Sequence, residues 1–482
     1  YLIVNRGNIE FKNSYKIDFD INENKKSLKK NKKDLINYFL QIKKKLDSNK
    51  NDVDTTELEF FNLRNDKYNY LDKILVFYSL KKKKFFKQYM IEVITDQKNY
   101  EDFYKSTFGK KVIITNLIKD INSNGQNFQL FYKYLGFIVR AFYFLLLIKI
   151  FKKNRVPSKK SEFFLSFYPY FFKKNDIKLY NSKRNIYLNF SLTDETHLNL
   201  SPKKYFKHIK ELSNNNRIIS VEKFINFSEL IYSLKRFYLS YSKFKCHLKD
   251  DFLFKGINCT NLIRPHLVSS YLNRSKLFIY EKTLNNFSSK FEPKKIHYFL
   301  FEYNFGFFLK NKLKDIKKFI GYQHGIYTKN LMWLDLINYN KKIYLPDTVI
   351  YNQKKSKKIY NKNFKDIFYK EKKINLDKNI KITKSQSSDI LVYLGQHDMN
   401  DCIHYFLNNK KFKNKKIFFK LHPNNKIKIS SPIKNFYLIN KINKKNKFNV
   451  FLSPTTTMIY DFSRKNLKFD IIKFNYKINL WG

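Results

Sequence analysis

The fold of this chain is decided by the stretch KIFFKLHP at residues 416–423. Its apolar part is short and rich in β-formers, and it is stopped by Pro423, which cannot extend a strand ladder. We therefore expect His422 at the carboxyl end of a strand. A second stretch, FNVFLSPTTT at residues 448–457, follows the same plan. Its apolar run ends in hydroxyl residues, which predict a Ser/Thr cap and a helix from Met458.

Both strand ends suit a phosphate group. Free backbone N–H groups at a helix start and an imidazole at a strand end both favour anions. A further strand at 469–474 would complete a strand–helix–strand unit, whose ligands bind at the carboxyl ends of its strands. A turn histidine and a simple cap would explain either stretch alone, but the pair on consecutive strands favours a nucleotide site. The candidate ligands are His422, Pro423, Ser453, Thr455 and Thr456.

A second histidine follows a strand farther upstream. The block GYQHG at 321–325 follows a β-like run, and the strand-like run at 296–301 ends in Glu302. We expect Gly321 and Gly325 to let the backbone turn tightly near a ligand. Glu302 or His324 would then accept a proton from a substrate.

The loop GQHDMN at residues 395–400 also follows an apolar run, at 390–394. Gly395 and Gln396 are therefore further candidates for the donor site. The alternative is that Asp398 or Asp401 only caps the following helix.

Five blocks occur in a fixed order: Glu302, GYQHG at 321–325, LPD at 345–347, KLHP at 420–423 and SPTTT at 453–457. This series resembles bacterial surface carbohydrate biosynthesis proteins, which are similar to capsule and O-antigen glycosyltransferases of the GT-B type. The His-Gly and His-Pro pairing is also similar to that of teichoic acid polyol-phosphate transferases and of bacterial sialyl- and Kdo-transferases. The resemblance covers the chain from about residue 296 onward and is thinner over 161–210.

The resemblance implies an α/β fold with two Rossmann-like domains facing a cleft. It places His422 and the hydroxyls of Ser453, Thr455 and Thr456 on the nucleotide phosphate, and His324 at the His-Gly position that is catalytic in the polyol-phosphate enzymes. It further implies a metal-independent reaction with no resident cofactor. The nucleotide-sugar is a substrate, and the acceptor is a lipid-linked or glycan molecule.

Three regions are expected along the chain. Residues 1–70 form an N-terminal extension with one helix-like stretch at 35–46, and residues 71–340 form an acceptor domain. In the latter, strand-like runs such as 74–78 and 112–115 alternate with helical patterns, which predicts a parallel sheet. Residues 341–482 form the donor domain and begin with the strand at 348–351, after a boundary near 345–347. Both ends of the chain are expected to be truncated.

The net charge of +56 would ordinarily indicate a nucleic-acid partner. The lysines are spread along the whole chain and no nucleic-acid-binding motif is present, so we expect no such partner. Three cysteines without a C-x-x-C pair suit a reducing cytosol. The nine histidines show no metal-ligand spacing, so no metal site is expected.

The most apolar segment runs from Tyr134 to Phe151 and is interrupted by Arg140 and Lys149. Its uninterrupted core is far shorter than the roughly 20 residues of a spanning helix. We favour a buried helix, and the alternative is a helix lying in the membrane interface beside anionic headgroups. The protein is accordingly expected in the cytoplasm, with a peripheral contact at the inner membrane.

Together these features predict a glycosyltransferase that uses a nucleotide-activated sugar in cell-surface polysaccharide synthesis. One alternative is a phosphotransferase that uses a CDP-polyol. Another is a non-catalytic carbohydrate- or nucleotide-binding component of a polysaccharide assembly complex, which would need neither Glu302 nor His324.

Overall fold

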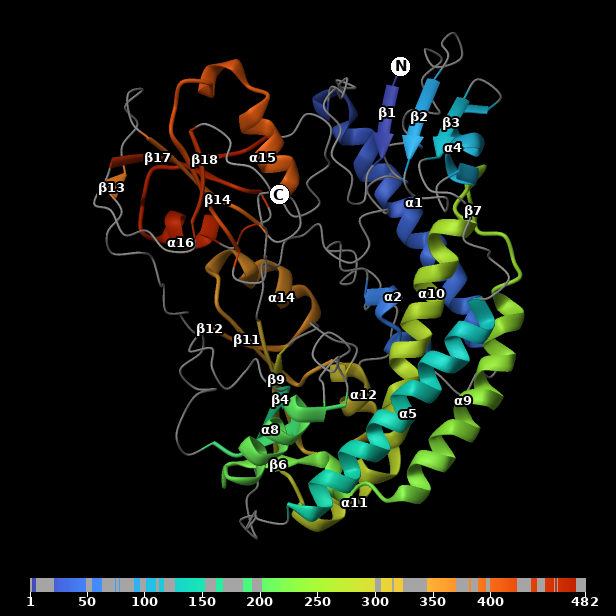
Figure 1. Ribbon diagram of the computed structural model, residues 1–482. Coiled ribbons are helices and arrows are strands. Elements are labelled where there is room, and N and C mark those ends of the chain that lie inside the picture. Colours follow the sequence, from blue (N-terminus) through green and yellow to red (C-terminus); the bar gives the residue numbers. More distant parts are fainter. Residues whose placement is uncertain are drawn as a thin grey trace. The chain divides into compact units, whose positions relative to one another are not determined.

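The computed structural model describes residues 2–5, 21–48, 54–62, 74, 78, 91–95, 101–109, 112–116, 126–151, 162–167, 185–192, 202–299, 305–313, 316–323, 345–369, 381–382, 389–395, 399–422, 435–439, 447–454, 456 and 458–473. The chain divides into two compact units (Figure 1). The first contains residues 1–324, 332–352 and 360–370, and the second contains 325–331, 353–359 and 371–482.

The first unit is built on a seven-stranded sheet in which every pairing is parallel. In spatial order its strands are β12 (Asp366–Tyr369), β11 (Thr348–Tyr351), β10 (Lys318–Tyr322), β9 (Lys295–Phe299), β4 (Glu162–Phe167), β5 (Tyr187–Phe190) and β6 (Ile218–Ser220). β5 and β6 are buried at every residue, as expected for a parallel sheet covered on both faces. From β4 the chain proceeds to β5 and β6 on one side, then returns to β9 on the other, so the direction of winding reverses between β4 and β9.

One predicted strand belongs to a different sheet from the one we expected. The run at 348–351 is a strand, but it pairs with β10 through Ile320 and Thr348 and so extends the first sheet. The next strand, β12, pairs with it in turn. The expected boundary near 345–347 therefore falls inside the first unit. The apolar run marks a strand, but its hydrogen-bond partner depends on the path of the preceding connection.

Helices are interspersed with these strands in sequence, although the predicted alternation is not regular, because several helices follow one another between β6 and β9. The helices of the first unit are α1 (Ile21–Ser48), α2 (Glu59–Asn62), α4 (Glu101–Phe108), α5 (Gln126–Ile150), α8 (Pro202–Ser213), α9 (Phe227–His247), α10 (Thr260–Ser275), α11 (Glu281–Phe291) and α12 (Phe305–Lys312), with the short 3₁₀ helices η1 (Thr55–Glu57), η6 (Val221–Phe224) and η7 (Lys276–Tyr280). α14 (Lys357–Asn363), preceded by η9 (Lys354–Ser356), lies between β11 and β12 in sequence. A small antiparallel hairpin joins β7 (Leu253–Phe254) to β8 (Ile257–Asn258).

The region that we expected to be an extension is part of the first unit. α1 contains the predicted helical stretch at 35–46, and Leu35 and Phe39 are fully buried in the main core. β1 (Leu2–Asn5), β2 (Ile91–Thr95) and β3 (Val112–Asn116) form a separate parallel sheet of three strands. The strand expected at 74–78 is not supported, because Ile74 and Tyr78 are helical.

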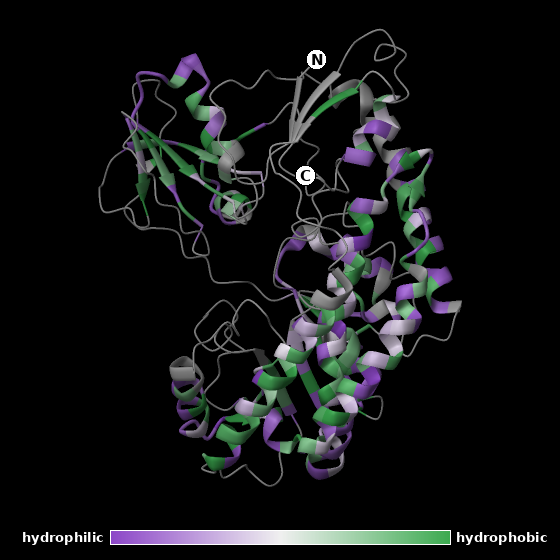
Figure 2. Ribbon diagram, turned by 45° about the vertical axis from the view of Figure 1, so that its right-hand side comes forward, coloured by the Kyte–Doolittle hydropathy of each residue, from purple (hydrophilic) through white to green (hydrophobic). Residues whose placement is uncertain are grey.

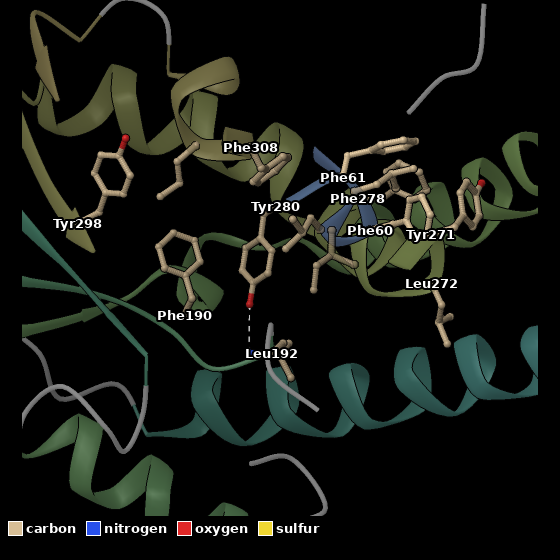
Figure 3. Close-up of a cluster of buried hydrophobic side chains, with 14 of the residues drawn as sticks. Phe60, Phe61, Phe190, Leu192, Tyr271, Leu272, Phe278, Tyr280, Tyr298 and Phe308 are labelled. Atoms are coloured by element: carbon tan, nitrogen blue, oxygen red, sulfur yellow. Dashed lines mark hydrogen bonds between the residues drawn. The ribbon is translucent and has the colours of Figure 1, made fainter. Parts of the chain in front are cut away.

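A buried ion pair fastens η1 to α10. Arg274 is 2% exposed and forms a salt bridge with Glu57, which is fully buried. Asn311 donates a second hydrogen bond to the same carboxylate (Nδ2 to Oε1, 2.8 Å). Phe60 and Phe61, which follow η1, lie in the aromatic cluster with Phe278 and Phe308 (Figure 3). The chain near residue 57 is thus held both by charge and by apolar packing.

The second unit is a six-stranded parallel sheet with a core on each face (Figure 2). Its strands are β13 (Lys381–Ile382), β17 (Lys447–Leu452), β14 (Asp389–Tyr393), β15 (Ile417–Lys420) and β16 (Phe436–Ile439) in spatial order, with β18 (Asp470–Ile471) also paired to β17. Alternate residues of β14 face opposite cores. Ile390 and Val392 pack with α15 (Met399–Leu407) and η10 (Lys410–Phe412), whereas Leu391 and Tyr393 pack with α16 (Met458–Arg464). Helices therefore cover both faces, as in a doubly wound fold.

Candidate functional site

The three strands singled out by the sequence are neighbours in the second sheet. Tyr393 of β14 is in register with Lys420 of β15 on one side and with Leu452 of β17 on the other. Because all three strands are parallel, Gly395, His422 and Ser453 follow at the same carboxyl edge. The strands before His422 and Ser453 are not consecutive as we expected, because β16 lies between them in sequence and β14 lies between them in the sheet, but both still end at one carboxyl edge.

This edge also contains the point at which the winding of the sheet reverses. From β14 the chain proceeds to β15 and β16 on one side, then crosses to β17 on the other, with β18 beyond it. Ligands of open α/β sheets bind outside the carboxyl ends of the strands at such a reversal. Gly395 and Ser453 follow the two strands that flank it.

The hydroxyl residues shape the turn into α16. Ser453 is fully buried, and its N–H donates to the carbonyl of Tyr393 (2.9 Å). The N–H of Thr456 donates to the Ser453 carbonyl (3.1 Å), and the Thr456 hydroxyl accepts from the N–H of Met458 (3.4 Å). Thr456 thus accepts the first N–H of α16, while Thr457, which directly precedes the helix, lies outside the described residues. His422 is partly exposed, so its imidazole can reach a bound molecule.

Several predicted site residues lie outside the described residues. They are Glu302, His324, Gly325, Gln396, Pro423 and Thr455. Their places in the chain are still informative. Glu302 follows the end of β9 by three residues, and His324 follows the end of β10 by two.

Gly321 does not have the role that we expected. It lies within β10, buried and in register with Tyr298 on one side and Val349 on the other. It is therefore a strand residue and not a turn glycine. The strand continues to Tyr322 because the backbone of β10 pairs with both neighbours up to that residue.

Two polar residues at this edge were missed by the sequence analysis. Gln323 and Asn352 follow β10 and β11, and both are buried. The N–H of Asn352 donates to Oε1 of Gln323 (3.1 Å), and its Nδ2 donates to the Gln323 carbonyl (3.1 Å). Oδ1 of Asn352 has no hydrogen-bond partner among the described residues. The reasoning applied to His422 could have found both residues, because each is the first polar residue after an apolar strand.

A chain of three side chains crosses one face of the first sheet. His297 of β9 contacts Glu162 of β4 through Nε2 (2.5 Å to Oε1) and Tyr322 of β10 through Nδ1 (2.8 Å to the hydroxyl). Phe164 stacks on the imidazole with ring centroids 4.1 Å apart. Burial lowers the pKa of His297, and the Glu162 carboxylate acts in the opposite direction. The sequence did not indicate this cluster, because its members are far apart in the chain.

A third polar cluster lies at the carboxyl end of β5. The buried carboxylate of Glu222 accepts hydrogen bonds from the N–H groups of Ser191 and Leu192 and from the Tyr280 hydroxyl. The Tyr280 hydroxyl also accepts from the Leu192 N–H (3.2 Å; Figure 3). His208 contacts the Ser191 hydroxyl through Nε2 (3.0 Å). Burial raises the pKa of Glu222 and lowers that of His208 to about 3. These groups fasten β5 to η6, η7 and α8.

Among the described residues, no three or more His, Cys, Asp and Glu side chains gather closely enough to hold a metal ion. The strand order shows that this is an α/β protein with two doubly wound parallel sheets. No model of a known protein family matches the chain, and no curated protein shows significant sequence similarity to it.

Proposed function

We propose that this chain is a GT-B-type glycosyltransferase that uses a nucleotide-activated sugar to build a cell-surface polysaccharide. The observation that carries the proposal is the gathering of Gly395, His422 and Ser453 at one carboxyl edge, beside the reversal of the second sheet. Two doubly wound parallel sheets in one chain also support it, because a GT-B enzyme has one such domain for the acceptor and one for the donor.

In this proposal His422 lies beside the donor phosphate. An acceptor hydroxyl attacks the anomeric carbon, the bond from that carbon to the phosphate oxygen breaks, and the nucleotide leaves with the bonding electrons. His422 and the turn at 453–456 stabilise the negative charge that develops on the departing phosphate. The acceptor proton passes to Glu302 or His324, each of which follows a strand of the first sheet. This single displacement inverts the anomeric centre and uses no resident cofactor.

Nucleotide binding is the first test. Calorimetric titration with CMP, CDP, UDP and GDP should give saturable binding of at least one nucleotide. His422→Ala should weaken that binding about tenfold or more, since a charge-assisted hydrogen bond contributes roughly 1.5–3 kcal/mol. The matched control is His404→Ala, which removes a partly exposed histidine of the same unit from within α15. Absence of binding to all four nucleotides, or equal binding by the His422→Ala variant, would overturn the proposal.

Product analysis separates the enzymatic alternatives. Mass spectrometry of an acceptor incubated with the protein and the selected donor should show addition of a sugar without phosphorus. Addition of a polyol phosphate would instead identify the phosphotransferase. Nucleotide binding with no product from any donor would favour a non-catalytic binding component.

A further inference from the structure

α5 carries an apolar stripe along its outer face. The stripe consists of Tyr132, Val139, Phe142, Tyr143, Leu146 and Ile150, all exposed. Val139 is 60% exposed and Ile150 is 72% exposed, which is unusual for aliphatic side chains of a folded protein. At 100° per residue these positions fall on one side of the helix. From Tyr132 to Ile150 they extend over about 27 Å of the helix, at a rise of about 1.5 Å per residue.

The opposite side of α5 is fixed in the core of the first unit. Tyr134, Ala141 and Phe144 are fully buried. Tyr134 stacks on Phe237 of α9 with ring centroids 3.9 Å apart, and its hydroxyl bonds to Ser233. The segment Leu130–Ile150 is long and apolar enough to cross a membrane by length and composition. Its buried side, however, is tied to α9, so the helix presents its outer stripe while remaining part of the folded unit.

α9 lies beside α5 (Figure 1) and also carries exposed apolar side chains. Ile231, Tyr232, Tyr238 and Leu239 are exposed on it, and Ile231 is 73% exposed. We call the ten exposed side chains of the two helices the α5/α9 apolar face. Four of the ten are tyrosines, whose rings combine an apolar body with a polar tip and suit a water–lipid boundary.

The exposed charges on the two helices themselves are of one sign. α5 contains no Asp or Glu. Helix geometry places Lys133 and Arg140 along one flank of its stripe and Lys149 along the other. On α9, Lys235, Lys243 and Lys245 are exposed. The one acidic residue of α9, Glu229, is buried and accepts a hydrogen bond from Thr283, so it does not offset the exposed lysines.

We propose that the α5/α9 apolar face docks on an anionic lipid bilayer. The helices lie in the plane of the interface, their apolar side chains enter the headgroup region, and the flanking lysines bind lipid phosphates. Charge favours this occupant over a second copy of the chain. Two copies, each with net charge +56, would bring their cationic flanks together, whereas an anionic bilayer complements them. The inference does not depend on the proposed transferase activity.

The test is co-sedimentation of the full chain with lipid vesicles. Vesicles of equal parts phosphatidylcholine and phosphatidylglycerol should bind the wild-type protein at least tenfold more tightly than vesicles of phosphatidylcholine alone. The double variant Val139→Glu, Leu146→Glu should reduce binding to the anionic vesicles about tenfold or more. Both positions are exposed, so the fold should be retained, as checked by circular dichroism.

The matched control adds two negative charges elsewhere on the first unit. Asn361→Glu in α14 and Phe368→Glu in β12 replace exposed residues, one of which is an apolar ring. This double variant should bind anionic vesicles as the wild type does. Equal loss in both double variants would mean that only total charge matters, and it would overturn a dedicated face.

A second measurement reports insertion directly. Tyr132→Trp places an indole on the stripe, and its fluorescence should shift to the blue with anionic vesicles and be quenched by lipids brominated on the acyl chain. An indole that remains water-exposed while the protein is vesicle-bound would overturn docking through this face.

Sedimentation velocity tests the remaining alternative, which is that the face binds a second copy of the chain. If the wild type is a dimer that Val139→Glu, Leu146→Glu converts to a monomer with unchanged vesicle binding, the face is a contact between copies and not a membrane surface.

Discussion

The side chain of Gln323 and the backbone of Asn352 join two adjacent strand ends of the first sheet. The Asn352 N–H donates to Oε1 of Gln323 at 3.1 Å, and both residues are nearly inaccessible to solvent. The link lies immediately before His324 in the chain. It therefore fixes the backbone of the residue that directly precedes His324.

Replacing Gln323 by Ala should destabilise the first unit. The Asn352 N–H would lose its acceptor in a buried position, which costs about 1–3 kcal/mol. Differential scanning calorimetry should show a lower transition temperature for Gln323→Ala. Asn286→Ala, at an exposed position of α11, is the control and should change stability by less than about 0.5 kcal/mol. Equal stability of the two variants would mean that the link contributes nothing.

Two glycines in helices should respond in opposite directions to substitution by alanine. A Cβ on Gly306 of α12 would lie 2.8 Å from Cε2 of the buried Tyr298 ring, whereas one on Gly136 of α5 meets nothing within 4 Å. Gly306→Ala should therefore destabilise the protein by about 1–3 kcal/mol through overpacking. Gly136→Ala should stabilise it by about 0.5–1 kcal/mol, because alanine restricts the unfolded chain. Thermal unfolding of both variants checks the sign, and a stabilised Gly306→Ala would show that the Tyr298 ring moves freely.

Stability should rise with pH through the window set by His208. Its pKa is about 3 in the folded protein against an ordinary value of 6.5, because burial disfavours the charged ring. The unfolded chain thus binds the extra proton between these values, and acid favours unfolding by on the order of 5 kcal/mol across the window. The free energy of unfolding can be measured with urea between about pH 4 and 7, which covers most of this window. It should depend less steeply on pH in His208→Gln than in the wild type. An unchanged slope would mean that the folded protein protonates this ring as readily as the unfolded chain does.

Glu222 should have the opposite effect on the pH dependence of stability. Burial raises the pKa of its carboxyl above the ordinary value of 4.5, so the folded state holds the proton to higher pH than the unfolded state does. Its contribution is fully present below pH 4.5 and is lost as pH rises through the raised pKa. In Glu222→Gln the amide keeps the acceptor for Tyr280 and can donate to Ser220. This variant should therefore show a steeper increase of stability with pH than the wild type, and a shallower one would contradict the assignment.

Removing the cation of the buried Arg274–Glu57 pair should destabilise the protein strongly. Arg274→Met leaves a buried carboxylate without its partner, which costs about 3–5 kcal/mol. Adding Glu57→Gln should recover much of that loss, since no buried charge then remains at residue 57. The exposed pair between Lys105 and Glu101 in α4 provides the control, and Lys105→Met should cost less than about 1 kcal/mol. Additive effects of the two core substitutions in calorimetry would show that the residues are not coupled.

Local patterns in the sequence were sufficient to predict several strands, such as those at 348–351, 390–394 and 417–421, but not the state of residues 74–78. The runs ending at Leu421 and Leu452 are apolar, short and followed by residues that stop a strand, so they are recognisable without their partners. The partners themselves are set by crossover connections. That is why the strand at 348–351 was identified but assigned to the wrong sheet.

The candidate site was predictable to the same extent. His422 and Ser453 each follow a strand, and parallel neighbours necessarily bring such residues to one edge. The pairs Gln323–Asn352 and Glu162–His297 are contacts between residues 29 and 135 positions apart, which no local pattern contains. Gly321 shows the converse error, because its residue type suggested a turn where strand pairing on both sides kept the backbone extended.

The ion pair between Glu57 and Arg274 also has a consequence for the order of folding during synthesis. Its two residues are 217 positions apart in the chain. At the usual rate of translation, roughly ten to forty seconds separate their appearance from the ribosome. Through that interval the carboxylate of Glu57 and the neighbouring rings of Phe60 and Phe61 have no α10 to pack against. The N-terminal segment must wait for the middle of the chain, so a ribosome-bound chain that ends before Arg274 should leave residues 54–62 open to a protease.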